Sequence, residues 1–371
     1  MAVAASAVLL PTAFAGGDPE AEAAAKPTVD GATTASFEKL ADAVLTQRTA
    51  ALLDNGQARR STPMTDRRAG LSAGVARSEK EAVSSLRSRK DRLAALGEVY
   101  TAATTDVRVD KTRVKDRRAT VRVTETTTLT YKRIRGDEPA TTGFQAHHEL
   151  SFAFTPRGTW ELTGMRSTDE GPVAINEPFA ARTAAAAADT GVPSATPAST
   201  RRPSQQTQKP PGTAGYDYQA MAAYAEKYWS NYNPAYPAYN SAGGDCTNFI
   251  SQALKAGGWK HDPGLYSDYT NWWYDPTLGA SVSFVGANEW SWFALHSKRT
   301  TNLGNVYDMG IGDVLQVDFD RDGSKDHTMM TTYRSRYGTP YLTYHSTDTY
   351  RKSVASLIAS YPNALYYAYR T

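Results

Sequence analysis

The sequence predicts a protein of two α+β regions joined by a linker, and three observations support this prediction. The chain has 371 residues, more than the roughly 250 at which a single hydrophobic core usually stops growing. Residues 181–215 are rich in Ala, Pro, Ser and Thr and lack hydrophobic periodicity, which is typical of an unfolded linker. Six of the seven tryptophans follow residue 215, so the two regions must build different cores.

The overall charge argues against one class of partner. The net charge is +3 and 21% of residues are charged, whereas nucleic-acid binding needs a concentrated basic field. We therefore expect no nucleic-acid partner. No later stretch reaches the ~18 apolar residues that a transmembrane helix requires, so we also expect no transmembrane segment, and a monomer.

The N-terminus resembles an export signal. Residues 1–15, MAVAASAVLLPTAFA, are small and apolar, and their last three residues fit the A-x-A pattern that signal peptidase cuts. This predicts a signal peptide over 1–15 and a secreted, extracellular or cell-wall-associated protein. The positively charged segment that normally opens such a peptide is missing, so the alternatives are a start that lies upstream and a disordered Ala-rich terminus. Residues 16–33 have the composition of a disordered lead-in.

Residues 34–180 predict an N-terminal α+β domain. The stretch FEKLADAVLTQRTAALL (38–54) has apolar residues at helical spacing. Four segments rich in Thr, Val and aromatic residues then alternate in the manner of antiparallel strands, at 100–109, 118–134, 144–154 and 159–167. Helix followed by antiparallel sheet suggests a cystatin- or NTF2-like domain. We find no catalytic constellation in it.

Residues 216–371 predict a second α+β domain, which is richer in tryptophan and tyrosine than the first. Its helices are expected at 216–229, from Asp245 onward, and around 288–299. Its strands are expected at 312–319, 327–335, 341–347 and 364–370.

The single cysteine of the chain lies at the start of the second of these helices. Gly243-Gly244-Asp245 is a break-and-cap signal, so Cys246 takes the first helical position, ahead of the apolar stripe that begins at Phe249. Backbone N–H groups at a helix N-terminus favour the nucleophilic thiolate and can hold a developing oxyanion. The alternative is an inert buried cysteine, since cysteine is among the most buried residue types.

A cysteine nucleophile needs a base, and two histidines follow at strand positions. If the strands pair as a hairpin about Arg336, His327 and His345 are cross-strand neighbours on one face, and a one-residue change of register separates them. In that geometry His345 orients His327, with Asp348 as the competing orienting group. The other four histidines offer no such arrangement: His147, His148, His261 and His296.

Four stretches together resemble a known family. DCTNFISQALKAGGW, NWWY, GDVLQVDFDRDGSKDHTMM and YHSTD are similar to the domain family named "Putative amidase domain", found in secreted Gram-positive proteins. That family belongs to the papain-like cysteine hydrolases, with NlpC/P60 and CHAP domains. The resemblance covers residues 216–371 and implies a papain-like fold with Cys246 as nucleophile, His327 as base and His345 as third polar residue. The spacing between the two histidines exceeds that of NlpC/P60 relatives, so the third residue stays open between His345 and Asp348.

The resemblance implies a cysteine amidase or peptidase that needs no cofactor. Its expected substrate is an amide bond in a peptide or in cell-wall peptidoglycan stem peptides. Two alternatives remain: an acyltransferase with the same nucleophile, and a non-catalytic cell-wall or glycan-binding module.

Three further residues could contact substrate. Asp245 is either a helix cap, which we favour, or a contact for a substrate amine. Asn248 follows on a helix that also faces the core, and is expected to stabilise a loop. Trp273 belongs to an aromatic cluster at 266–275 which, with Trp290 and Trp292, lines a groove or forms core.

An acidic turn precedes His327. DFDRDGSKD (318–326) has the D-x-D-x-D-G arrangement that places oxygen ligands around calcium, but the twelfth position of an EF-hand loop is Met329 instead of glutamate. The alternatives are a structural calcium site, which would rigidify the turn, and a solvated turn without metal. The candidate ligands are Asp318, Asp320, Asp322 and Asp326.

Overall fold

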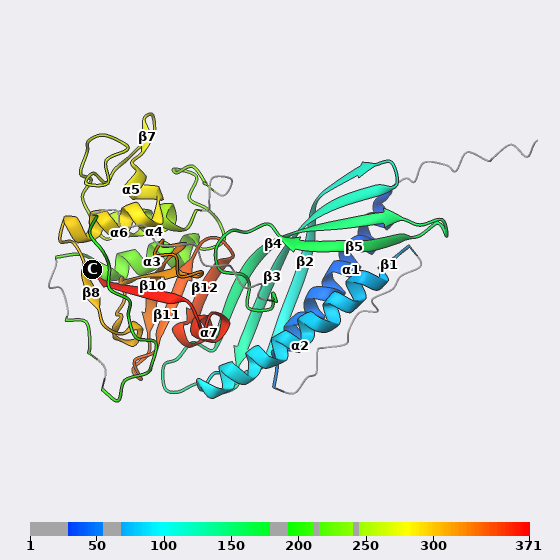
Figure 1. Cartoon of the computed structure of the whole chain (residues 1–371), viewed down its shortest axis with the longest axis horizontal. Helices are drawn as coiled ribbons and strands as arrows, with labels where there is room; N and C mark the ends of the chain where they lie inside the picture. Colours follow the sequence, from blue (N-terminus) through cyan, green and yellow to red (C-terminus); the bar gives the residue numbers. More distant parts are fainter. Residues whose placement is uncertain (1–28, 55–67, 179–191, 206, 211–214, 240–244) are drawn as a thin grey trace, which may run out of the picture.

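The computed structural model describes residues 29–54, 68–178, 192–205, 207–210, 215–239 and 245–371. The predicted signal peptide, residues 16–28, Gly243 and Gly244, and part of the predicted linker lie outside these ranges. Within them the protein is elongated, with an N-terminal α+β region at one end and a C-terminal α+β region at the other (Figure 1). The α+β prediction is confirmed for both regions.

Two long helices cover one side of the N-terminal sheet. The first begins at Gly31, within the stretch expected to be disordered, because the Asp30 carboxylate accepts a hydrogen bond from the Thr33 amide at 2.7 Å. Ser72 caps the second helix in the same way, at the Val75 amide. The helices are α1 (Gly31–Ala50) and α2 (Ala73–Ala95).

The four strand predictions of this region are confirmed. The strands form an antiparallel sheet in which β3 pairs with β2 and β4, and β4 also pairs with β5. Alternate residues of β3 and β4 point toward the helices and are buried, among them Val121 and Leu150, which pack with Phe37 and Trp160. The strands are β1 (Ala69–Leu71), β2 (Tyr100–Lys115), β3 (Arg118–Tyr131), β4 (Thr141–Phe154) and β5 (Trp160–Ser167).

The C-terminal region is a sheet with helices on both faces. Phe249, Ile250 and Met330 belong to the core on the face covered by α3, α4 and α6, and Val317, Met329 and Leu357 to the core on the opposite face, which α7 covers. The helices are α3 (Tyr218–Tyr228), α4 (Cys246–Ala256), α5 (Val282–Val285), α6 (Ala287–His296), η1 (Val306–Asp308) and α7 (Val354–Ser360). The strands are β6 (Tyr274–Asp275), β7 (Gly279–Ala280), β8 (Thr301–Leu303), β9 (Val314–Asp318), β10 (His327–Arg334), β11 (Pro340–Tyr344), β12 (Asp348–Ser353) and β13 (Leu365–Arg370).

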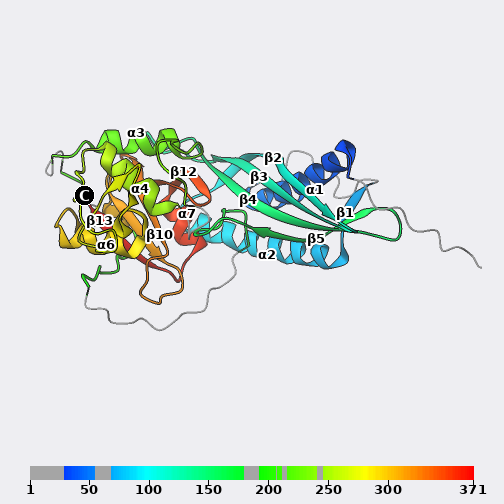
Figure 2. The ribbon, with the colours of Figure 1, turned by 90° about the horizontal axis from the view of Figure 1, so that it is seen from above.

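The two sheets are joined into one. Strand β12 pairs antiparallel with β4, so that Asp348 lies opposite Gln145 and Tyr350 opposite Gly143. Beside this joint, α7 meets the C-terminal end of α2 (Figures 1 and 2), where the Arg92 guanidinium donates to the Ala359 carbonyl at 2.9 Å. The regions are therefore in direct contact.

Part of the predicted linker is folded against the C-terminal region. Ala195 and Ala198 are buried in its two cores. The Ala198 amide donates to the Tyr366 carbonyl at 2.6 Å, and the Ser199 amide to that of Gly304 at 2.9 Å. Small apolar residues suffice here because the backbone supplies the hydrogen bonds, so the prediction of an unfolded linker is wrong for this stretch. None of the described helices is long and apolar enough to cross a membrane.

Candidate active site

Cys246 is the first residue of α4, as predicted. The helix is fixed by an apolar stripe with no exposed surface, which includes Phe249 and Leu254. The Cys246 side chain itself is buried, with 5% exposure for the residue. Burial raises the pKa of the thiol, and it outweighs the hydrogen bonds from Thr247 and from the Thr328 backbone that lower it. In this conformation the helix N-terminus therefore does not suffice to ionise the sulfur.

Asp245 does not cap α4 through its side chain, which corrects the favoured prediction. One carboxylate oxygen, Oδ2, lies 2.8 Å from Nδ1 of His345. The other, Oδ1, accepts hydrogen bonds from the Tyr239 amide at 2.9 Å and from the Asn248 side chain at 2.8 Å. These partners occupy the oxygens that a cap would use. Asn248 also donates to the Pro237 carbonyl in the preceding loop at 3.0 Å.

His345 lies on the same side of the sheet as α4, and its ring is contacted on both faces and at both nitrogens. Its ring is stacked between Phe249, at 3.7 Å between centroids, and Tyr232, at 3.8 Å. Its Nε2 lies 2.8 Å from the Tyr228 carbonyl. A carboxylate and a carbonyl oxygen only accept, so both contacts of the ring are hydrogen bonds when each nitrogen carries a proton. Asp245 and the Tyr228 carbonyl therefore fix the orientation of the ring.

His327 lies on the other face of strand β10. Its neighbour Thr328 points toward α4, with its hydroxyl 2.8 Å from that of Thr247. Because side chains alternate along a strand, His327 points away from α4. Its ring packs against Tyr344 at 5.2 Å between centroids.

The predicted pairing of His327 with His345 is wrong. The hairpin between β10 and β11 forms, but Met330 pairs with Thr343 and Tyr333 with Tyr341. A β-bulge between Thr331 and Tyr333 shifts the register, and a one-residue shift moves side chains to opposite faces. The structure thus packs His345 against Asp245 and against Phe249 of α4, and does not bring the two histidines together.

The remaining predicted residues have other partners. Asp348 accepts hydrogen bonds from the Tyr232 hydroxyl at 3.0 Å and the Ser346 amide at 3.2 Å, and burial raises its pKa to about 6. Trp272 and Trp290 are fully buried core residues, whereas Trp273 is only partly buried. The core interpretation of the aromatic cluster therefore holds for the first two.

The acidic turn brings three of its four aspartates together. Carboxylate oxygens of Asp318, Asp320 and Asp326 lie within 4.8 Å of one another, and Asp322 is not part of this group. Burial raises the pKa of Asp318, and so do the charges of Asp320 and Asp322, against hydrogen bonds from the amides of Gly323 and Arg321 that lower it. Calcium at this turn stays a prediction.

Two residues of the site have no obvious sequence signal. Tyr232 stacks on His345 from a Pro- and Tyr-rich loop that reads as irregular. Thr328 follows the more conspicuous His327, yet it is the side chain that faces α4. Only the register of β10 reveals this role.

Comparisons with known proteins identify the C-terminal region. Residues 215–369 match the family model described as "Putative amidase domain". This segment carries that domain. The predicted family resemblance is therefore confirmed for the segment, and the family name indicates amide hydrolysis as the class of activity.

Two curated relatives from Bacillus subtilis (strain 168) show matches of similar extent. The uncharacterized protein YhbB is 31% identical over 137 residues, which is 36% of this chain and 42% of the relative. The uncharacterized protein YjcM is 33% identical over 141 residues, which is 36% of this chain and 32% of the relative. The chain thus spans less than half the length of these relatives. A solved structure, the intermembrane space region of the chloroplast protein ARC6, aligns with 38% of this chain and 98% of its own at 19% identity and a TM-score of 0.25, which is too low to establish a shared fold.

Proposed function

We propose that the amidase-family domain hydrolyses amide bonds with Cys246 as the nucleophile. The observation that carries this proposal is that the sole thiol of the chain opens helix α4 within the segment that matches the amidase family. In the reaction the Cys246 sulfur attacks the amide carbonyl, and N–H groups at the start of α4 stabilise the oxyanion. The base takes the thiol proton as the sulfur attacks and gives it to the leaving amine when the C–N bond breaks. The base then takes a proton from water, whose oxygen attacks the thioester, and the Cys246 sulfur regains that proton as the free acid is released.

We assign the acid–base role to His345, oriented by Asp245. His345 lies on the α4 side of the sheet, and the residue that holds its Nδ1 precedes Cys246 in the chain. The family resemblance gives this role to His327, whose ring lies on the other face of β10. Because the thiol is buried and protonated in this conformation, catalysis requires that substrate or a rearrangement expose the sulfur and free Nε2 of His345 from the Tyr228 carbonyl.

Site variants test these assignments. Peptide amides and peptidoglycan stem peptides are incubated with the full chain, and newly released amino groups are quantified. Cys246→Ala should abolish release, and His345→Gln should reduce it by about 100-fold, the scale of general acid–base catalysis, whereas His327→Gln should reduce it less than about tenfold. Full activity of Cys246→Ala overturns the proposal. The opposite order for the two histidine variants transfers the base role to His327.

We further propose that the protein is exported and acts on cell-wall peptide amides, on the support of the N-terminal sequence and the family resemblance. Cell fractionation locates the protein, and an exclusively intracellular pool would contradict export. Product analysis with an added amine distinguishes hydrolysis from acyl transfer, because an acyltransferase forms a new amide instead of a free acid.

A second candidate is a non-catalytic wall-binding module. The buried, protonated thiol favours it. Iodoacetamide labelling decides between the two, because Cys246 is the only thiol in the chain. A binding module should label slowly with and without wall fragments, whereas an enzyme should label faster when substrate fragments open the site.

A further inference from the structure

The segment 171–177, which we call the connecting segment, leaves the N-terminal sheet after β5 and is buried over residues 174–177. Such connections normally run over the surface. Here Asn176 is fully buried, Ile175 is 3% exposed and Glu177 is 8% exposed. A glutamate is seldom buried unless it is paired, so the partners of Glu177 indicate what holds the segment.

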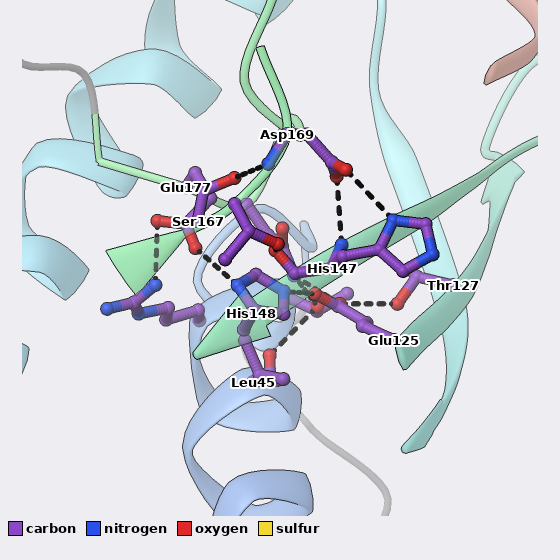
Figure 3. Close-up of polar contacts among 12 residues, drawn as sticks. Leu45, Glu125, Thr127, His147, His148, Ser167, Asp169 and Glu177 are labelled. Atoms are coloured by element: carbon purple, nitrogen blue, oxygen red, sulfur yellow. Dashed lines mark hydrogen bonds and ion pairs between the residues drawn. The ribbon is translucent and has the colours of Figure 1, made fainter. Parts of the chain in front are cut away.

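The N-terminal region binds Glu177 through both its carboxylate and its backbone carbonyl. Arg48 donates to Glu177 Oε2 at 2.9 Å, and Nδ1 of His148 lies 3.2 Å from Oε1 (Figure 3). The Arg89 guanidinium donates to the carbonyls of Ile175 at 2.5 Å and Glu177 at 2.7 Å. Arg48 and His148 therefore bind the acidic side chain of the connecting segment, and Arg89 binds its main chain.

Arg48 and His148 are themselves fixed by other buried residues. Glu79 holds Arg48 through two hydrogen bonds, at 2.7 and 2.8 Å, and Glu125 holds Nε2 of His148 at 3.0 Å. Burial opposes a charge on His148, but the hydrogen bonds and charges of Glu125 and Glu177 raise its pKa to about 9. The geometry is that of a preorganised site for a carboxylate.

Between these contacts the N-terminal region binds an amide side chain, that of Asn176. Nδ2 of Asn176 donates to the Thr49 hydroxyl at 2.8 Å and to the Glu125 carboxylate at 2.6 Å. Arg48 and Thr49 come from α1, Arg89 from α2 and Glu125 from β3. The N-terminal region thus binds the Asn176 amide, the Glu177 carboxylate and the carbonyls of residues 175 and 177.

The other end of the connecting segment covers His327 in the amidase-family domain. Gly171 has φ +94°, and a Cβ at this position would lie 2.6 Å from Nδ1 of His327. The Val173 amide donates to the Tyr361 hydroxyl at 2.5 Å. His327 is only 1% exposed. Only glycine approaches this ring so closely with such a backbone conformation.

We propose that Arg48, Arg89 and His148 form a binding site for an acidic peptide, that residues 175–177 occupy it in this chain, and that their occupancy keeps Gly171 on His327. The site belongs to the N-terminal region, outside the segment that matches the amidase family. It does not depend on amide hydrolysis. Release of residues 175–177 exposes His327 and leaves the site open to another peptide that offers the same carbonyls and carboxylate.

Chemical modification of histidines tests the covering of His327 without a substrate. The full chain is treated with diethyl pyrocarbonate, and modification of each histidine is followed by peptide mass spectrometry. Glu177→Gln removes the charge and keeps the side-chain size, so His327 should react at least tenfold faster than in the wild type. The exposed His296 serves as the control for general histidine reactivity. Equal His327 rates in variant and wild type overturn the proposal.

Gly171→Ala provides a second, independent variant at the far end. Its Cβ must displace the segment from His327 while the buried charges of the N-terminal region stay intact. The variant should therefore also speed His327 modification by tenfold or more. If Glu177→Gln proves unfolded by circular dichroism, Gly171→Ala decides the covering alone, and an unchanged rate in it refutes the covering.

Peptide binding in trans tests the site itself. A fluorescent peptide of residues 171–178 is titrated into a full chain in which Ile175, Asn176 and Glu177 are replaced by Gly and Ser, and anisotropy is measured. This chain should bind the peptide, and a peptide with Gln at position 177 should bind at least tenfold more weakly. The wild type should not bind, since its own segment fills the site. Should the replaced chain not fold, the Glu177→Gln chain takes its place. Absent or charge-independent binding refutes the peptide site.

Discussion

The buried ion pairs of His148 make the stability of the N-terminal region depend on pH. His148 has no exposed surface and lies between Glu125 and Glu177 (Figure 3). Its pKa is about 9 in the folded chain and about 6.5 in an unfolded chain. At ~1.4 kcal/mol per pKa unit this difference corresponds to about 3 kcal/mol. His148→Gln keeps the ring position filled but cannot carry the charge.

The pH window follows from the direction of the shift. Because the folded pKa lies above the unfolded one, the contribution of His148 is fully present below about pH 6.5 and is lost as pH rises through about 9. Burial lowers the pKa of Lys352 to about 7 and that of Lys209 to about 8. Their effect has the opposite sign, since the cost of their buried charge disappears with rising pH. The difference between wild type and His148→Gln isolates the histidine.

Unfolding experiments measure this difference. Trp160 is the only tryptophan before residue 215, so its resonance in a fluorotryptophan-labelled chain reports unfolding of the N-terminal region. In urea titrations the wild type should exceed the variant by about 3 kcal/mol at pH 6, and the gap should nearly close by about pH 9.5. A gap that stays constant with pH refutes the charged assignment, and His148 is then a packing residue only.

Three further predictions concern the C-terminal region. Asp348 has a folded pKa of about 6, above the ~3.9 of a free aspartate, so its burial costs stability, and this cost appears as pH rises from about 4 to 6. Asp348→Asn should be more stable than wild type at pH 7 by up to about 3 kcal/mol and equally stable at pH 3.5, and equal stability at pH 7 contradicts this. Phe249→Ala removes a fully buried ring and the stacking on His345, so it should lower the free energy of unfolding in urea titrations by about 3–5 kcal/mol. A decrease of less than about 1 kcal/mol would show that the surrounding side chains collapse into the cavity. Millimolar calcium should raise the melting temperature of the wild type but not that of Asp318→Asn, and identical shifts in both would place the ion elsewhere.

Sequence patterns predicted the elements whose local signal agrees with their tertiary environment. The Thr- and Val-rich alternation of β3 and β4 gives one buried face and one open face. Helix α2 is hard to recognise in the sequence because Lys, Arg and Glu fill most of its surface. Its buried stripe consists of only a few apolar residues: Val75, Ala82, Leu86 and Leu93. Strand β12, DTYRKS, is polar because it joins two sheets and carries Asp348 and Lys352 into their contact.

The candidate site was predictable in its parts but not in its arrangement. Local signals predict Cys246 at a helix start, His327 at the start of β10 and His345 next to β11, which it follows directly. The face that each histidine occupies depends on one bulged residue in β10, and bulges leave no reliable mark in a sequence of Thr, Met and Tyr. The capping prediction for Asp245 was wrong for a similar reason, because its partner His345 lies 100 positions away.

The start of β10 connects the two sites described above. On one face of β10 the Thr328 hydroxyl contacts that of Thr247 in the first turn of α4. On the other face Gly171 lies against the His327 ring. Because these side chains belong to consecutive residues of one strand, displacement of the connecting segment should alter the packing around Cys246. Glu177→Gln should therefore change the iodoacetamide labelling rate of Cys246 in parallel with the exposure of His327, whereas the control variant Glu81→Gln, at an exposed position of α2, should change neither. Faster His327 modification with an unaltered Cys246 rate would show that the two faces of β10 respond independently, and that the peptide site does not influence the nucleophile.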